Sequence, residues 1–240
     1  MLKRKIRSFV RREGRITNSQ KRALEELWDK FGIDKTVRVE SKLIFERSAP
    51  LHLEIGFGMG HSLFELATQN RDDDYIGIEV HRPGVGRLLD EIDKSGITNL
   101  KIIKEDAIEV LQQQILPQSL DSVMLFFPDP WHKKKHNKRR IVQTTFVETI
   151  YEKLKPGGLF HLATDWEEYA HWMMEVMESN SGFKNSAGKG EFTPRPELKV
   201  RPNSKFEKRG ERLGHGVWDL IFKKDRSEER RVGKECRSRW

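Results

Sequence analysis

The chain has 240 residues, of which 36% are hydrophobic and 34% charged, and its formal net charge is +8. This size suits one α/β domain with a full core, and no run approaches the roughly 18 apolar residues of a membrane helix, so we expect no membrane span. The only cysteine is Cys236, which argues against disulfides, Cys-ligated zinc, iron–sulfur clusters and a Cys nucleophile, and we expect no metal site.

The first 48 residues form a basic N-terminal extension. Leu24, Leu27 and Trp28 share one face of a short helical pattern over residues 19–31. No apolar signal segment follows the basic start, so we expect a cytoplasmic protein. The positive charge of the whole chain favours a polyanionic partner.

From residue 51, short apolar runs alternate with helical patterns, which is typical of βαβ units and a parallel sheet. The runs predict strands at residues 51–55, 75–80, 100–104, 122–127 and 159–164. The helical patterns predict helices at residues 61–69, 83–95, 107–115, 141–154 and 166–179. A late strand is predicted at residues 217–222, after a long Gly-, Pro- and Lys-rich loop over residues 188–216.

The last fifteen residues, 226–240, contain six Lys or Arg and three Glu and show no apolar periodicity. They follow a strand that already ends the α/β pattern, and they resemble vector read-through. We therefore expect the domain to span residues 49–225 and the tail to be dispensable for it.

A glycine turn follows the first predicted strand. Glu54 and Ile55 precede Gly56, Gly58 and Gly60, and glycines there allow a tight turn and a close backbone approach to a ligand. A dinucleotide site would have its third glycine at position 61, which is His61, and Glu54 would repel a pyrophosphate. The cationic S-adenosylmethionine suits this acid better, while a plain structural turn is the alternative.

Two further acids follow the next two strands. Glu79 lies about twenty residues past the glycines, where an acid accepts the ribose hydroxyls of a nucleotide; a solvated surface Glu is the alternative. Asp106 either binds the adenine amino group or caps the following helix.

The fourth strand ends in Pro128-Asp129-Pro130-Trp131, at the carboxyl end where open α/β sheets bind ligands, an ordinary Pro-rich turn being the alternative. The prolines hold Asp129 rigidly. Six of the next nine residues are Lys or Arg, so we expect RNA phosphate contacts there, a solvated face being the alternative. The residues expected to contact the RNA backbone are Lys135, Lys138, Arg139 and Arg140. Trp131 and Trp166 either stack on a flipped base or, as we prefer, pack in the site wall.

With Lys155-Pro156-Gly157-Gly158 before the fifth strand, the glycine turn and Glu79 resemble class I S-adenosylmethionine-dependent methyltransferases. The Pro-Asp-Pro-Trp segment and its basic run resemble the tRNA (guanine-N7)-methyltransferase family, and the similarity extends over most of residues 8–222. Other matching segments are residues 8–12, 54–60, 79–81, 163–166, 204–207 and 216–220. Ser204 stands where the family has Thr, and it keeps the hydroxyl.

This resemblance implies a Rossmann-like class I domain with a mostly parallel sheet, helices on both faces and an antiparallel late strand. It implies methylation of guanine N7 at tRNA position 46, with S-adenosylmethionine as cofactor and Asp129 as the catalytic residue. The implied cofactor-binding residues are Glu54, Gly56, Gly58, Gly60, Glu79, Asp106 and Asp129. The implied guanine or tRNA contacts are Lys133, Asp165, Ser204, Lys205, Phe206 and Glu207.

The chemistry agrees with this assignment, because guanine N7 carries no proton and needs no base before it attacks a sulfonium methyl. Asp129 or Asp165 would bind the guanine edge, and the residues do not decide between them. Two alternatives are an N-methyltransferase acting on an exocyclic amine of another RNA base and an RNA-binding protein with an inactive fold. We expect a monomer or homodimer without an obligatory protein partner.

Overall fold

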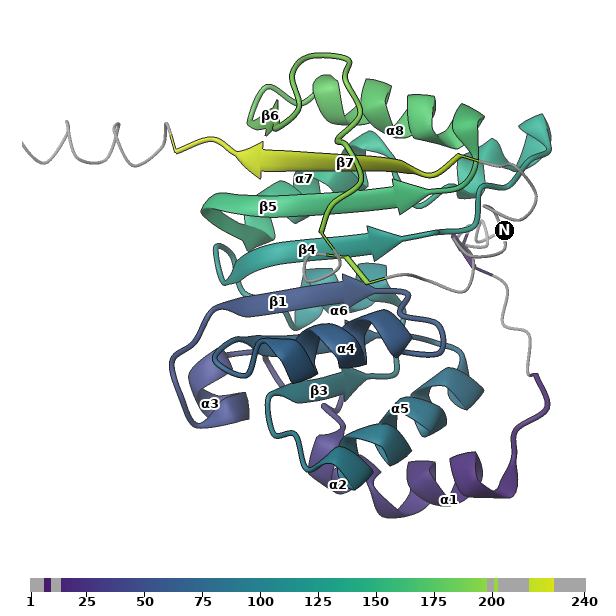
Figure 1. Ribbon diagram of the computed structural model, residues 1–240, viewed down its shortest axis with the longest axis vertical. Coiled ribbons are helices and arrows are strands. Elements are labelled where there is room, and N and C mark those ends of the chain that lie inside the picture. The colour runs from purple at the N-terminus through teal and green to yellow at the C-terminus, as the bar shows by residue number, and fades with distance from the viewer. Residues whose placement is uncertain (1–6, 10–13, 198–200, 203–215, 227–240) are drawn as a thin grey trace, which may run out of the picture.

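The computed structural model describes residues 7–9, 14–197, 201–202 and 216–226. Among these residues, seven strands form one sheet in the order β3-β2-β1-β4-β5-β7-β6 (Figure 1). The strands are β1 (Leu51–Ile55), β2 (Asp74–Ile78), β3 (Leu100–Ile103), β4 (Leu120–Phe126), β5 (Leu154–Thr164), β6 (Phe183–Asn185) and β7 (Trp218–Lys224). The first five are parallel, and β7 pairs antiparallel with β5 and β6. The expected sheet, including its antiparallel late strand, is confirmed.

Most of the predicted strands begin and end within two residues of the prediction, and β1 matches it. β5 differs most, since it begins at Leu154 rather than at residue 159. Leu154 pairs with Leu120 of β4, and a register shift between Leu120 and Ser122 lets the pairing continue. The short β6 was not predicted.

Helices cover the sheet. They are α1 (Asn18–Glu26), α2 (Trp28–Phe31), α3 (Ser41–Phe45), α4 (His61–Gln69), α5 (Arg82–Ser95), α6 (Ala107–Gln113), α7 (Thr144–Lys153) and α8 (Glu167–Glu178), with a 3-10 turn, η1 (Lys134–Arg139). The single helix predicted over residues 19–31 is two helices, and α3 was not predicted. α7 starts three residues late because the Val142 carbonyl accepts a hydrogen bond from Trp172 Nε1 instead of entering a helix.

Two apolar clusters bury the two faces of the sheet. One contains side chains of α6, α7 and α8, and the other contains side chains of α1, α4 and α5. Val123 and Leu125 of β4 belong to the first cluster, whereas Met124 and Phe126 belong to the second, as the alternation of side chains along a strand requires. The expectation of helices on both faces is confirmed. No helix in the described part of the chain is long and apolar enough to cross a membrane.

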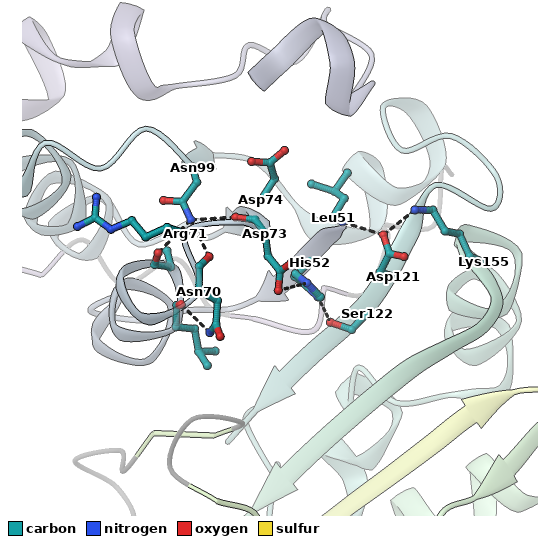
Figure 2. A network of polar contacts seen from close by, with 12 residues as sticks. Leu51, His52, Asn70, Arg71, Asp73, Asp74, Asn99, Asp121, Ser122 and Lys155 are labelled. Atoms are coloured by element: carbon teal, nitrogen blue, oxygen red, sulfur yellow. Dashed lines mark hydrogen bonds and ion pairs between the residues drawn. The ribbon is translucent and has the colours of Figure 1, made fainter. Parts of the chain in front are cut away.

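A polar network ties the amino ends of the parallel strands together (Figure 2). His52 Nδ1 lies 2.7 Å from Ser122 Oγ, and His52 Nε2 lies 3.3 Å from Asp73 Oδ2. Burial lowers the pKa of His52, and this outweighs the opposing effect of Asp73. Asp74, which is fully buried, is paired with Arg47. We interpret the network as structural, because it lies at the amino ends of the strands, whereas ligands bind at the carboxyl ends in open α/β folds.

Candidate functional site

A cavity of about 220 Å³ opens at the carboxyl ends of β1, β2 and β4. The strand order reverses between β1 and β4, which is where open α/β sheets bind ligands. Its lining residues are Ser8, Phe9, Ile55, Gly56, Ile78, Glu79, Val80, Glu105, Asp106, Ala107, Leu125, Phe126, Phe127, Pro128, Asp129 and Ile141. Gly56, Glu79, Asp106 and Asp129, which the sequence singled out, therefore lie around one cavity.

The glycine turn forms one wall. Gly56, Gly58 and Gly60 have φ angles of 73°, 59° and 79°, a left-handed backbone that glycine adopts without steric cost. A Cβ added at Gly56 or Gly58 would meet no atom within 4 Å, so open space lies beside the turn. Arg87 of α5 fixes the turn by donating to the Met59 carbonyl at 2.7 Å.

Glu79 joins the glycine turn to the end of β2. Its Oε2 accepts from Gly58 N–H at 2.8 Å, and its Oε1 accepts from Val80 N–H at 2.7 Å and His81 N–H at 2.9 Å. The carboxylate is thus oriented by three backbone donors at the cavity wall. A carboxylate has about four acceptor sites, so one is left for a ligand.

Glu54 is 3% exposed and is not among the cavity-lining residues. Its Oε2 has no hydrogen-bond partner among the described residues. Burial, followed by repulsion from Glu79, raises the pKa of Glu54 to about 8. A buried carboxyl in this state becomes ionised readily only when a cation binds nearby.

Asp106 caps α6, because its Oδ1 accepts from Ile108 N–H at 3.0 Å. The capping role is therefore confirmed, and the same side chain also lines the cavity, where adenine binding stays a prediction.

Asp129 is exposed at the end of β4, and none of the described residues donates a hydrogen bond to its carboxylate. Phe127 and Trp131, on either side of the Pro-Asp-Pro motif, have φ angles of 52° and 49°. A bulky residue in this region is strained, so the surrounding structure holds the turn in place. Asp165 follows β5, the strand next to β4, and is half-buried.

The basic run divides into two groups. Lys133, Lys135 and Lys138 are exposed on and before η1, as phosphate contacts need to be. Arg140 is 2% exposed and pairs with Glu168 at 2.8 Å, so its side chain is not available to RNA, and the prediction that it contacts the RNA backbone is withdrawn.

Arg139 holds a segment that sequence reasoning did not assign to the site. Its Nε donates to the Arg7 carbonyl and its Nη2 to the Phe9 carbonyl, each at 3.2 Å, while its guanidinium lies 4.1 Å from the centroid of the Trp131 ring. Trp131 Nε1 donates to the Ser8 carbonyl at 3.0 Å. These contacts place Ser8 and Phe9 in the cavity wall, although they precede Trp131 and Arg139 by more than a hundred residues in the sequence.

The side chains of Trp131 and Trp166 contact protein neighbours, and neither is among the cavity-lining residues. Trp166 contacts His132, with 4.2 Å between ring centroids, and packs against the core. Ser204, Lys205, Phe206 and Glu207, the implied guanine contacts, lie outside the described residues.

Comparisons with known proteins give a consistent result. A family model described as "Putative methyltransferase" matches residues 48–220. Three similar proteins are each named tRNA (guanine-N(7)-)-methyltransferase. The one from Alcanivorax borkumensis is 55% identical over 222 residues, covering 92% of both chains. The one from Aeromonas hydrophila subsp. hydrophila is 56% identical over 222 residues, covering 92% of this chain and 93% of the relative. The one from Hydrogenovibrio crunogenus is 53% identical over 227 residues, covering 92% of both.

Solved structures resemble this one in fold. The 16S rRNA methyltransferase KamB has a TM-score of 0.56 at 14% identity, covering 77% of this chain and 92% of that one. A mutant of the 16S rRNA (adenine(1408)-N(1))-methyltransferase from Catenulisporales acidiphilia has a TM-score of 0.56 at 13% identity, covering 80% and 94%. At these identities the likeness shows the fold alone.

Proposed function

The chain belongs to the tRNA (guanine-N7)-methyltransferase family, and we propose that it transfers a methyl group from S-adenosylmethionine to N7 of guanine 46 in the tRNA variable loop. The observation that supports this most is the 53–56% identity to enzymes of that name over 92% of the chain. The acidic cavity at the strand ends agrees with it. We propose that the protein acts in the cytoplasm, where its substrate is.

The residues around the cavity fit S-adenosylmethionine, which when bound supplies an electrophilic methyl group on a sulfonium. Glu54 is not itself in the lining but adjoins the lining residue Ile55, and it fits an ammonium because its buried Oε2 has no partner among the described residues. Glu79 would accept from a ribose hydroxyl through the acceptor site that its three backbone bonds leave open. Asp106 would accept from the adenine amino group, and the glycine turn leaves room for the backbone to approach the ligand.

Asp129 would act on the acceptor. Guanine N7 has a lone pair in the plane of the base and no proton, so the protein has to orient the base rather than deprotonate it. Asp129 can accept from the guanine N1 and amino edge, and its negative charge stabilises the cationic product as it forms. Asp165, after the neighbouring strand, is the second candidate for this contact. Lys133, Lys135 and Lys138 would bind the tRNA backbone.

The test is methylation of unmodified tRNA transcripts with labelled S-adenosylmethionine, followed by nucleoside mass spectrometry. A transcript with guanine at position 46 should yield N7-methylguanosine, and one with adenine at that position should yield none. An N-methylated exocyclic amine as the product, or equal methylation of both transcripts, would contradict the proposal. Binding of tRNA without any binding of S-adenosylmethionine would indicate an inactive RNA-binding protein.

A further inference from the structure

The described residues of the segment that follows β6, 186–197 and 201–202, form no helix or strand, and this crossing segment covers part of the sheet. In Figure 1 the chain that follows β6 crosses the front of β7 and β5 toward β4. Thr193 in this segment donates its N–H to the Asp219 carbonyl of β7 at 2.8 Å. Arg201, near the far end of the crossing, is 1% exposed. A cationic side chain is almost never buried so deeply unless it is paired.

The partner of Arg201 is the buried carboxylate of Asp219. Arg201 Nε donates to Oδ1 at 2.6 Å and Nη2 donates to Oδ2 at 2.8 Å, a two-point contact that only a guanidinium can make. His161 of β5 adds a third contact, with its Nε2 2.8 Å from Asp219 Oδ1. The carboxylate of Asp219 thus joins the crossing segment to β7 and β5.

The ionisation states agree with this arrangement. Burial by itself raises the pKa of Asp219, but the hydrogen bonds from His161 and Arg201 and the nearby positive charge hold it below its ordinary value. Burial lowers the pKa of His161, and this outweighs the opposing effect of Asp219. Of these three residues, Arg201 is the cation, Asp219 the anion and His161 a neutral imidazole.

The same cluster contacts the end of β4. The Arg201 guanidinium lies 5.7 Å from the centroid of the Phe127 ring, and His161 packs edge-on against Phe126 at 4.9 Å. Phe127 has the strained positive φ and comes two residues before Asp129. Its N–H donates to the Ala163 carbonyl at 2.8 Å, and Ala163 pairs with Asp219 in the sheet.

We propose that Arg201, held by Asp219 and His161, is a positioning residue for methyl transfer. Arg201 lies on the face of the sheet that the crossing segment covers, and from there it supports the turn that contains Asp129. This inference rests on the proposed function.

The test compares Arg201→Gln, Arg201→Lys and the double variant Arg201→Gln/Asp219→Asn. Measurements are the single-turnover rate at saturating tRNA and S-adenosylmethionine, the Kd of the cofactor and the Tm. Arg201→Gln should lower the rate by about a hundredfold, the scale of a 1 Å misplacement, while the cofactor Kd changes less than about threefold. Arg201→Lys keeps the charge but not the two-point geometry, so it should recover only part of the rate.

Arg47→Gln is the matched control, because it breaks another arginine pair with a buried carboxylate, that of Asp74, at the amino ends of the strands. It should lower the Tm and leave the saturated rate per folded enzyme within about threefold of wild type. The double variant removes both buried charges and should regain Tm, since an unpaired buried charge is what destabilises most. Its rate should nevertheless stay low.

The proposal is overturned if Arg201→Gln turns over at the same rate per folded enzyme as Arg47→Gln, or if the double variant regains the rate together with the Tm. Either result would make the cluster structural only. Failure of the proposed function gives a different signature, because the wild-type protein would then form no N7-methylguanosine. The variants would then be compared with wild type by the rate at which each forms the methylated nucleoside that the wild type does produce.

Discussion

Asp129 is the residue whose removal should affect the chemical step most. It stands at the cavity wall between two prolines, where a fixed carboxylate can orient the guanine edge and stabilise the charge that develops. Asp129→Ala should lower the single-turnover rate at saturation by at least about a hundredfold, the scale of losing one electrostatic stabiliser. Asp129→Asn keeps the shape but not the charge and should recover little. A rate within about threefold of wild type would transfer the role to Asp165.

Glu54 should make the cofactor-free protein less stable as pH rises. Its folded pKa of about 8 lies above the ordinary value of 4.5, so the carboxyl binds a proton on folding. Its contribution to the free energy of unfolding is then largest at low pH and falls as pH rises from 4.5 through 8. In thermal melts, the Tm of Glu54→Gln should fall less than the Tm of wild type when the pH is raised from 6 to 8.5.

The control for Glu54 is Glu65→Gln, on the exposed face of α4, which should melt with the pH dependence of wild type. Glu54→Gln should also bind S-adenosylmethionine more weakly, because it lacks the charge that an ammonium requires. If Glu54→Gln and wild type lose Tm equally with rising pH, the carboxyl is ionised throughout and its burial is incomplete in solution.

At the scale of elements, the contact between η1 and the N-terminal segment should govern how long the cofactor stays bound. Arg139 and Trp131 hold Ser8 and Phe9 in the cavity wall. Arg139→Gln removes two hydrogen bonds to backbone carbonyls, each worth about 0.5–1.5 kcal/mol, and should weaken cofactor binding by about tenfold. Stopped-flow dissociation of S-adenosylmethionine would measure the change.

Lys138→Gln, next to Arg139 but exposed, separates this effect from the loss of positive charge. It should leave the cofactor dissociation rate unchanged and affect tRNA binding alone. Equal dissociation rates for the two variants would mean that the N-terminal segment does not retain the cofactor.

At the scale of the whole molecule, tRNA affinity should depend on salt through one region of the surface. Lys133→Gln/Lys135→Gln should reduce the slope of log K against log salt by about 0.7–0.9 for each lost phosphate contact. The control pair, Lys94→Gln/Lys184→Gln, removes the same charge from exposed positions on α5 and β6. Filter binding between 50 and 200 mM salt tests the pairs, and equal slopes for the two would show that only net charge attracts tRNA.

Local patterns in the sequence determined the parallel strands, the helices that follow them and the acids at the strand ends. They succeed because a strand buried on both faces needs a continuous apolar run, and because the glycine turn requires glycine at each positive φ. Glu54, Glu79 and Asp129 are found for the same reason, since each stands at a fixed place relative to a strand end. Arg140 is the exception within a local motif, because a charge run does not show which of its members turns inward.

Only the tertiary structure decided which distant residues complete the site. Ser8 and Phe9 reach the cavity through two hydrogen-bonding side chains, Trp131 and Arg139, which lie more than a hundred residues away. Arg201 and Asp219 meet His161 because β7 inserts beside β5 and the segment that follows β6 crosses the front of both strands. Neither contact leaves a periodic signature in sequence. Both depend on contacts between residues far apart in the chain, and such contacts are set by proximity in space rather than by spacing along the sequence.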